Sequence, residues 1–139
     1  MNVLDLKRWR AGYSVGNWLL DNQHRVLLGL CDEAIELVPK DKLCDMLDPK
    51  FQSARDDLLF YIQEHFKTEE RLLRLYAKSI HEQHYDEHRY FWQLLNEKLQ
   101  EIANGEIGRE EFRQFLTEWW TYHILQSDRK FSHLIQRAA

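Results

Sequence analysis

The strongest constraint on this chain is a set of histidines and carboxylates spaced along four helix-like segments. Five of the seven histidines belong to it. The set consists of His24, His65, Glu69, His84, His88, His123 and Asp128. Because imidazole and carboxylate groups both bind metals, this spacing predicts a metal site in the core of a helical bundle rather than scattered surface residues.

Two parts of the set have the spacing of one helix face. His65 and Glu69 are four residues apart, as are His84 and His88. Residues four apart lie on the same side of an α-helix, so each pair can offer both side chains to one centre. His24 adds a single ligand from the first segment, where it follows the apolar period of three and four residues and is therefore expected to point inward.

The last pair has a different spacing. His123 and Asp128 are five residues apart, which separates them by roughly 140° on an ideal α-helix. They need not bind one ion, because in a two-metal site the histidine can bind one ion while the carboxylate bridges to the other. The whole set also exceeds the needs of a single tetrahedral zinc ion. It suits two ions that share both carboxylates and a solvent-derived oxygen, with one position left open. The absence of thiolates favours iron or manganese.

Composition and periodicity predict an all-α fold. Glycine and proline are scarce, with 5 and 2 residues, and no alternating Val/Ile/Thr run appears. Asp48-Pro49 can begin a helix and Asn104-Gly105 can end one. We expect one domain over residues 1–139, an antiparallel up-down four-helix bundle. Its predicted parts are an N-terminal arm at 1–16 and helices at 17–38, 49–76, 80–104 and 109–136.

Charge and hydropathy argue against several function classes. The net charge is −4, and the absence of a concentrated basic stripe argues against nucleic-acid binding. No apolar run approaches the ~20 residues of a membrane span, and no cleavable hydrophobic signal is present. The two cysteines are too few for a disulfide framework. We therefore expect a cytoplasmic protein without membrane insertion and without a nucleic-acid partner.

Each candidate ligand has a simpler interpretation when it is taken alone. A single histidine on an apolar face, such as His24, is more often a hydrogen-bonded core residue. Asp128 precedes Arg129 and Lys130 and by itself fits a solvated helix end. Glu69 lies on a largely apolar stripe, where burial is costly unless the carboxylate is paired or binds a metal. Taken together, the set favours metal binding.

Four motifs contain the whole ligand set. They are Asp-Asn-Gln-His ending at His24, His-x-x-x-Glu from His65, His-x-x-x-His from His84 and His-x-x-x-x-Asp from His123. In this order they resemble the motifs of the hemerythrin family, specifically its bacterial single-domain branch. The segment from Trp9 to Gly16 also resembles the arm that leads into the first helix of that family. One such motif would be weak, but the ordered set covers nearly the whole chain and is highly specific.

The resemblance implies a non-haem di-iron centre with an oxo or hydroxo bridge. The implied ligands are His84, His88 and His123 on one iron, His24 and His65 on the other, and Glu69 and Asp128 as bridges. The iron with two histidines would be five-coordinate, and dioxygen would bind there. The protein would hold the ions in place and exclude water, whereas the metals would carry out the redox chemistry.

Two histidines remain outside this ligand set. His81 lies three residues before His84, but the family motif requires the pair at four-residue spacing, so we assign His81 to the surface or to a position behind the ligands. His133 is expected to be exposed to solvent. Gln126 and Ser127 follow His123 and are polar, so either could reach the site.

Large apolar side chains near the ligands predict a dry pocket. Core packing is the simpler interpretation for most of the aromatic residues. An oxygen site must also exclude bulk water, which large apolar side chains beside the open iron would do. The candidates for the pocket wall are Leu27, Leu28, Phe66, Trp119 and Trp120. Because the two tryptophans are adjacent in sequence, we expect that they cannot both face the irons.

The resemblance leaves three uses of bound dioxygen to be weighed. The first is a binding protein, without enzymatic turnover, for oxygen carriage, storage or buffering. The second is an oxygen- or redox-sensing domain of a bacterial signalling protein, with a fused or separate effector. A peroxidase-like or oxygen-scavenging enzyme ranks last, because no residue set resembles a dedicated general acid or base near the site.

Overall fold

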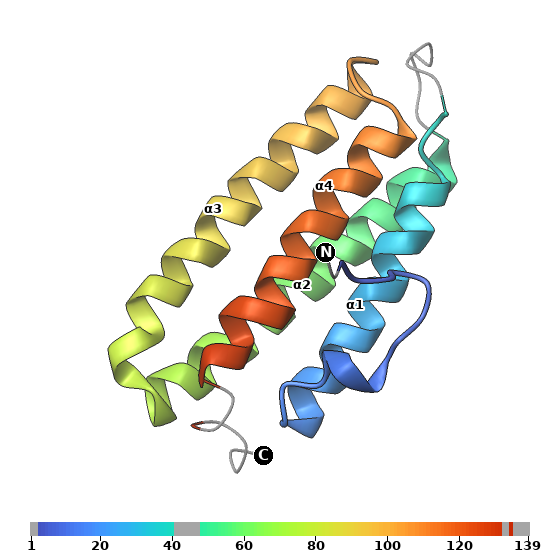
Figure 1. Cartoon of the computed structure of the whole chain (residues 1–139). Coiled ribbons are helices and arrows are strands. Elements are labelled where there is room, and N and C mark those ends of the chain that lie inside the picture. The colour runs from blue at the N-terminus through green and yellow to red at the C-terminus, as the bar shows by residue number, and fades with distance from the viewer. Residues whose placement is uncertain (1–2, 41–47, 132–133, 135–139) are drawn as a thin grey trace.

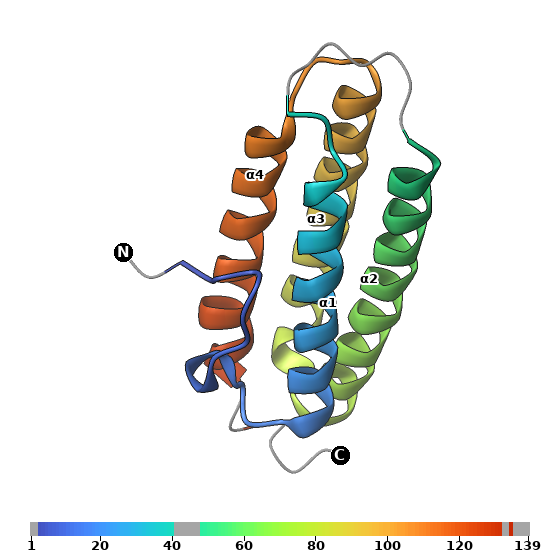
Figure 2. The ribbon, with the colours of Figure 1, turned by 90° about the vertical axis from the view of Figure 1, so that its right-hand side faces the viewer.

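The computed structural model describes residues 3–40, 48–131 and 134, and its long helices form a bundle (Figure 1). The helices are α1 (Trp18–Glu36), α2 (Pro49–Tyr76), α3 (Lys78–Ala103) and α4 (Arg109–Tyr122). Successive helices run in opposite directions, and α1 lies against both α2 and α4 (Figures 1 and 2). The described residues contain no strand. The predicted all-α, up-down four-helix bundle is therefore confirmed.

Two helix ends follow the predicted local chemistry. The Asp48 side chain accepts a hydrogen bond from the backbone N–H of Lys50, and Pro49 occupies the first turn of α2. α3 is followed by Asn104 and then by Gly105, whose φ of 72° lies in the left-handed region that favours glycine. These caps set where α2 begins and where α3 ends.

The fourth predicted helix, 109–136, is not one α-helix. α4 ends at Tyr122 and is followed by a π-helix at His123–Ser127 and a 3-10 helix at Asp128–Phe131. Residues 132–133 and 135–136 of the prediction lie outside the described residues. The Asp128 backbone N–H donates to the His123 carbonyl, a bond that spans one residue more than in an α-helix. Apolar periodicity does not distinguish one such wide turn from a continuing α-helix.

The N-terminal arm packs along the bundle beside α1 and α4 (Figure 2). Leu4, Leu6 and Tyr13 are buried, which anchors the arm through apolar contacts. The Leu4 N–H donates to Thr121 Oγ1 at 2.9 Å, and the Asp5 N–H donates to Tyr13 Oη at 2.8 Å. The arm is thus part of the folded domain.

The alternating helix directions decide where the predicted ligands meet. Those on α1 and α3 lie near the beginning of their helices, whereas those on α2 and after α4 lie toward the end. In an up-down bundle these four regions share one end, so segments far apart in sequence converge there. The other half is filled by apolar side chains, among them Phe51, Leu58, Leu95, Phe112 and Leu116.

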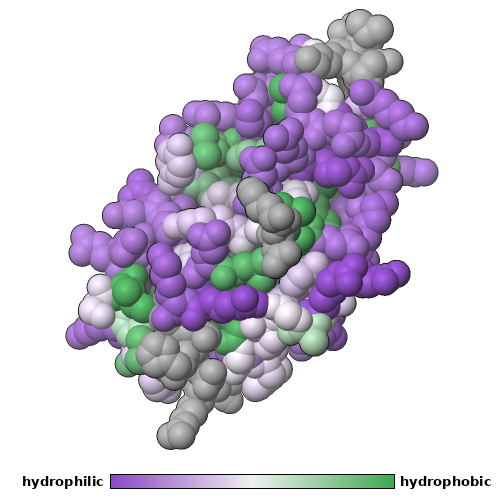
Figure 3. All heavy atoms as spheres, viewed as in Figure 1, coloured by the Kyte–Doolittle hydropathy of each residue, from purple (hydrophilic) through white to green (hydrophobic). Residues whose placement is uncertain are grey.

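The visible face of the molecule in Figure 3 is mostly hydrophilic, with smaller apolar areas between the polar side chains. Among the described residues, no helix combines the length and the apolar character needed to cross a membrane.

Candidate metal centre

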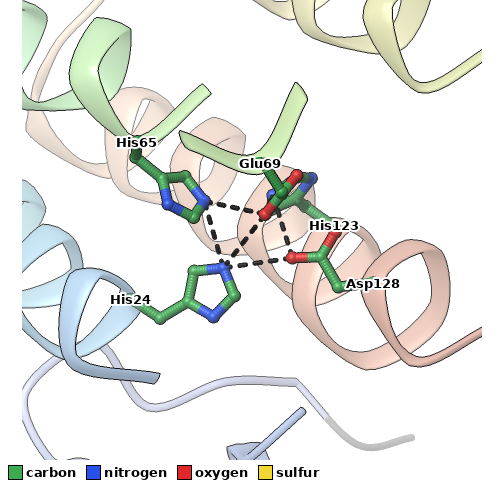
Figure 4. A group of neighbouring side chains, drawn as sticks. All are labelled: His24, His65, Glu69, His123 and Asp128. Carbon is green, nitrogen blue, oxygen red and sulfur yellow. Dashed lines mark hydrogen bonds and ion pairs between the residues drawn. The ribbon is translucent and has the colours of Figure 1, made fainter. Parts of the chain in front are cut away.

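All seven predicted ligands come together inside the bundle, and each is at most 3% exposed. α1 contributes His24, and α2 contributes His65 and Glu69, whose four-residue spacing places both on the inward face. Figure 4 shows these three beside two side chains from the segment after α4. α3 contributes the remaining pair, His84 and His88, at the same spacing.

The π-helix explains how the five-residue pair reaches the centre. Because the Asp128 N–H bonds to the His123 carbonyl, the wider turn brings the two residues closer to one face than the roughly 140° separation of an ideal α-helix would. His123 Nε2 is 3.2 Å from Asp128 Oδ2, and Figure 4 shows both side chains pointing into the same space. Our expectation from ideal helix geometry was therefore wrong for this pair.

The two oxygens of Glu69 face different histidines. Oε1 lies 2.5 Å from His84 Nε2 and 2.9 Å from His88 Nε2. Oε2 lies 3.0 Å from His65 Nε2 and 3.7 Å from His24 Nε2. A carboxylate that presents one oxygen to each group has the arrangement of a bridge between two cations.

Asp128 repeats this division on the other side of the centre. Its Oδ1 lies 3.1 Å from His84 Nε2, and its Oδ2 lies 3.1 Å from His24 Nε2. The site therefore has two halves, an α3 half with His84 and His88 and an α1/α2 half with His24 and His65. Both carboxylates extend across the two halves.

His123 stands between these halves. Its ring centre lies 5.4–5.8 Å from the ring centres of the other four histidines. Its Nε2 is 3.3 Å from Glu69 Oε2, on the side of the α1/α2 half. Two overlapping groups of ligand atoms, each compact enough for one ion, both include His123. The resemblance places it with His84 and His88, and that assignment stays a prediction.

The donor set fits a metal because several of its buried polar atoms have no hydrogen-bond partner among the described residues. They are Glu69 Oε2, both Asp128 carboxylate oxygens and both ring nitrogens of His123. A buried polar atom without a partner costs about 1–3 kcal/mol. Cations bound between the carboxylates and imidazoles would satisfy these atoms, and the absence of thiolate donors agrees with iron.

Hydrogen bonds behind two of the ligands orient their rings. His65 Nδ1 is 2.8 Å from Gln23 Oε1, and His88 Nδ1 is 2.7 Å from Glu70 Oε2. A partner that accepts from Nδ1 leaves Nε2 free to bind a metal. Sequence reasoning missed both partners because they lie on a neighbouring helix. The only signal was that Gln23 and Glu70 each adjoin a predicted ligand.

The buried groups of the cluster shift one another's pKa values in both directions. Burial alone would lower the pKa of His24 and His84, but Asp128 and Glu69 raise these values to about 9 and about 10. Burial lowers the pKa of His65 to about 4. Burial would also raise the pKa of Glu69, yet the surrounding imidazoles hold it well below its usual range. Without a metal, the cluster is therefore a mixture of charged and neutral imidazoles.

Metal binding is expected to release protons. At pH 7 the metal-free protein keeps His24 and His84 protonated, because both pKa values lie above 7. A metal binds only neutral imidazole, so filling the site should expel the protons of His24 and His84, and the affinity should rise with pH up to about 9–10. Zinc titration calorimetry in two buffers with different ionisation enthalpies measures this release. Equal observed heats in both buffers would contradict it.

The same two histidines give the metal-free fold a pH dependence. Their folded pKa values exceed the ordinary 6.5, so they contribute stability that is fully present below pH 6.5. That contribution is lost as the pH rises through about 9 and then about 10. Metal binding replaces it above neutral pH, because the ions then hold the carboxylates and imidazoles together.

Aromatic rings cover the ligands. Phe66 stacks on His88 with ring centres 3.8 Å apart, and Trp119 stacks on His123 at 4.5 Å. Trp120 meets His123 edge-on at 5.4 Å and is fully buried. The two tryptophans are nearly perpendicular, so both contact one ligand from different sides. Our expectation that they cannot both face the irons stays a prediction.

The other predicted positions divide between the core and the surface. Leu27 and Leu28 are buried on α1, and their place in a pocket wall stays a prediction. Gln126 is exposed, whereas Ser127 lies behind His84, with its Oγ 3.2 Å from His84 Nδ1. His81 belongs to neither group of ligand atoms and is half-buried, with its ring stacked on Tyr85. His133 lies outside the described residues.

Replacing one of two histidines on α3 tests the ligand set. His84→Ala is expected to lower the iron content and the stability, because it removes the buried imidazole that lies 2.5 Å from Glu69 Oε1 and 3.1 Å from Asp128 Oδ1. His81→Ala should keep the iron content of the unmodified protein. Metal analysis of the purified, iron-loaded variants measures this. Full iron content in His84→Ala would remove that residue from the ligand set.

Comparison with known proteins agrees with the motifs. A family model described as the hemerythrin HHE cation binding domain matches residues 15–135. A bacteriohemerythrin from Clostridium acetobutylicum is 26% identical over 129 residues, which cover 88% of this chain and 96% of that protein. A crystal structure of wild-type hemerythrin is similar in fold, with a TM-score of 0.76 at 18% identity over 93% of this chain and 97% of that one. The structure of a hemerythrin variant matches with the same TM-score, over 93% of this chain and 96% of that one.

Proposed function

This chain belongs to the hemerythrin family, and from that premise we propose that it is a non-haem di-iron protein that binds dioxygen reversibly. Its role would be oxygen carriage, storage or buffering in the cytoplasm. We propose one hemerythrin-like domain over residues 1–139, with residues 1–16 as its arm. The proposed iron ligands are His24, His65, Glu69, His84, His88, His123 and Asp128.

One observation carries the proposal. Each buried carboxylate, Glu69 and Asp128, turns one oxygen toward the α3 half and the other toward the α1/α2 half. Single-ion sites do not need two such carboxylates, whereas a pair of ions sharing both of them does. With His123 on the α3 half, the α1/α2 half has one histidine fewer, which leaves a position for dioxygen there.

The side chains around the ligands exclude bulk water from the site and fix its shape. When bound, the two ferrous ions supply the electrons with which dioxygen is held. Trp120 is fully buried, and its ring centre lies 6.5 Å from that of His24 and 6.1 Å from that of His65. A large apolar ring at this place excludes bulk water from the α1/α2 half, and water exclusion slows loss of the bound oxygen.

The site favours binding over turnover. Among the described residues, the ionisable groups that converge on the centre are the proposed ligands themselves. Catalysis of a proton-coupled reaction requires a further acid or base within hydrogen-bond reach of the substrate. We therefore propose a protein that binds and releases dioxygen without an enzymatic cycle.

The test is the visible spectrum of the protein loaded with iron, reduced without air and then exposed to it, together with a count of iron per chain. We expect two irons and a charge-transfer band that appears with oxygen and disappears when oxygen is removed. Immediate and irreversible conversion to the diferric spectrum would exclude an oxygen carrier. A protein without any iron-dependent band would overturn the di-iron proposal.

A further inference from the structure

The two ligands from α3 are backed by carboxylates. His88 Nδ1 lies 2.7 Å from Glu70 Oε2, on α2. His84 Nδ1 lies 3.2 Å from Ser127 Oγ, which donates to Glu87 Oε2 at 2.6 Å, and the same carboxylate oxygen is 3.4 Å from His84 Nδ1. The outer N–H of each ring therefore faces a negative charge, directly or through one hydroxyl.

Tyr122 helps to hold the second of these carboxylates. Its hydroxyl donates to Glu87 Oε1 at 3.1 Å, so both oxygens of Glu87 have a donor. The Glu70 and Glu87 side chains are only 16% and 22% exposed. Solvent screens such partly buried charges less than fully exposed ones, so their effect reaches the imidazoles.

The ligands of the α1/α2 half have no such support. His65 Nδ1 lies 2.8 Å from Gln23 Oε1, a neutral amide oxygen. The Gln23 amide nitrogen donates to Thr68 Oγ1 at 3.1 Å, which fixes the oxygen toward His65. His24 Nδ1 has no hydrogen-bond partner among the described residues. The two halves thus differ in the charge that stands behind their histidines.

This difference changes the ligands as electron donors. A carboxylate that accepts from Nδ1–H draws the proton outward and makes Nε2 more basic, which favours the more highly charged state of a bound ion. A neutral amide oxygen that accepts from Nδ1–H makes Nε2 less basic than a carboxylate does. We infer, on the premise of the proposed di-iron function, that Glu70 and Glu87 are positioning residues that make the α3 half the more readily oxidised half of the centre.

The two halves therefore have different tasks. The α3 half, with anionic support behind His84 and His88, stabilises ferric iron. The α1/α2 half, with neutral support, keeps the weaker donor set beside the position proposed for dioxygen. Glu70 and Glu87 act only through the imidazoles, because the atoms that face the centre belong to the ligands.

The experiment measures two quantities in Glu70→Gln and Glu87→Gln. The first is the affinity of the metal-free protein for zinc, measured by competition with a chelator, which we expect to fall about 10–100-fold. The second is the reduction potential of the iron-loaded protein. We expect this potential to rise, because loss of the carboxylate weakens the binding of ferric iron more than that of ferrous iron. If ferric affinity falls tenfold more than ferrous affinity, the one-electron potential rises by about 59 mV.

Two further variants control the charge change. Glu82→Gln removes an exposed carboxylate from the same helix, α3, and should leave both quantities unchanged. Gln23→Glu places a carboxylate behind His65 and should lower the potential. A potential that falls in Gln23→Glu and rises in the other two variants separates the effect of the carboxylates on the ligands from general structural damage. Gln23→Glu also tests the inference if Glu70→Gln or Glu87→Gln fails to fold.

The outcomes distinguish this inference from the proposed function. If the unmodified protein binds two irons while Glu70→Gln and Glu87→Gln match Glu82→Gln in zinc affinity and potential, the inference is wrong. If the unmodified protein takes up no iron, the di-iron function fails, and the fall in zinc affinity alone decides whether the carboxylates support the ligands. A higher potential in both variants and a lower one in Gln23→Glu would support the inference.

Discussion

Glu69→Ala is expected to abolish metal binding in both halves of the centre at once. Its carboxylate is fully buried and approaches the Nε2 atoms of all five site histidines within 3.7 Å. No neighbouring carboxylate can replace it, because Asp128 already contributes one oxygen to each half. Iron analysis of the purified variant should show a loss of both ions rather than of one.

The same variant should also destabilise the metal-free fold. Removing one member of a buried ion pair costs about 3–5 kcal/mol, because the remaining charge keeps its desolvation penalty. Burial lowers the pKa of His84, and the negative charge of Glu69 is the main cause that raises it. His84 would therefore lose its main partner. Chemical denaturation of the metal-free protein measures this loss. A further sign is that added iron should raise the Tm of the unmodified protein but not of the variant.

Glu64→Ala is the matched control on the same helix. Glu64 is exposed, and its carboxylate lies 3.4 Å from the Lys67 ammonium at the surface. Such pairs contribute about 0–1 kcal/mol, so iron content and unfolding should change little. If Glu69→Ala retained two irons per chain, or behaved as Glu64→Ala does in denaturation, the central role of Glu69 would be disproved.

Trp120→Ala is expected to destabilise the bundle and to shorten the lifetime of bound oxygen. Trp120 is among the largest fully buried side chains, and truncating a buried tryptophan costs about 3–5 kcal/mol. The cavity would also open beside His24 and His65, where water could enter the α1/α2 half. The free energy of unfolding tests the first effect, and the decay of the oxygen-dependent visible band tests the second.

Two variants separate these effects. Trp18→Ala removes a side chain that is 65% exposed, and its stability should change by no more than about 0.5 kcal/mol. Trp120→Phe keeps an apolar ring in the core and should restore most of the oxygen lifetime. An oxygen adduct that decays equally fast in Trp120→Ala and in the unmodified protein would show that this ring does not keep the site dry.

Much of the ligand geometry was predictable from local spacing. The pair His65 and Glu69 and the pair His84 and His88 lie four residues apart, and an α-helix necessarily turns such pairs to one side. The inward position of His24 followed from the apolar period around it. In each case the structure places these side chains in the core, because backbone hydrogen bonding within one helix determines which residues share a face.

The relative position of His123 and Asp128 could not be predicted from local sequence spacing. Ideal α-geometry separates them, yet a π-helix brings them within 3.2 Å of each other. A wide turn replaces α-helical hydrogen bonds with a less favourable pattern, so contacts with the other helices must stabilise it. Apolar periodicity along 109–136 carries no information about that choice. Trp119 and Trp120 follow the same rule, because the position of His123 decides that both can contact it.

The helical character of this protein, its family and the identity of the residues that converge in its core follow from residue type and order alone. Those properties depend on residue type and on spacing within single helices. The packing of the helices determines which oxygen of Glu69 and of Asp128 faces which half. It also places Gln23, Glu70 and Glu87 behind the histidines. These contacts join residues from different helices, so they exist only once the helices have packed.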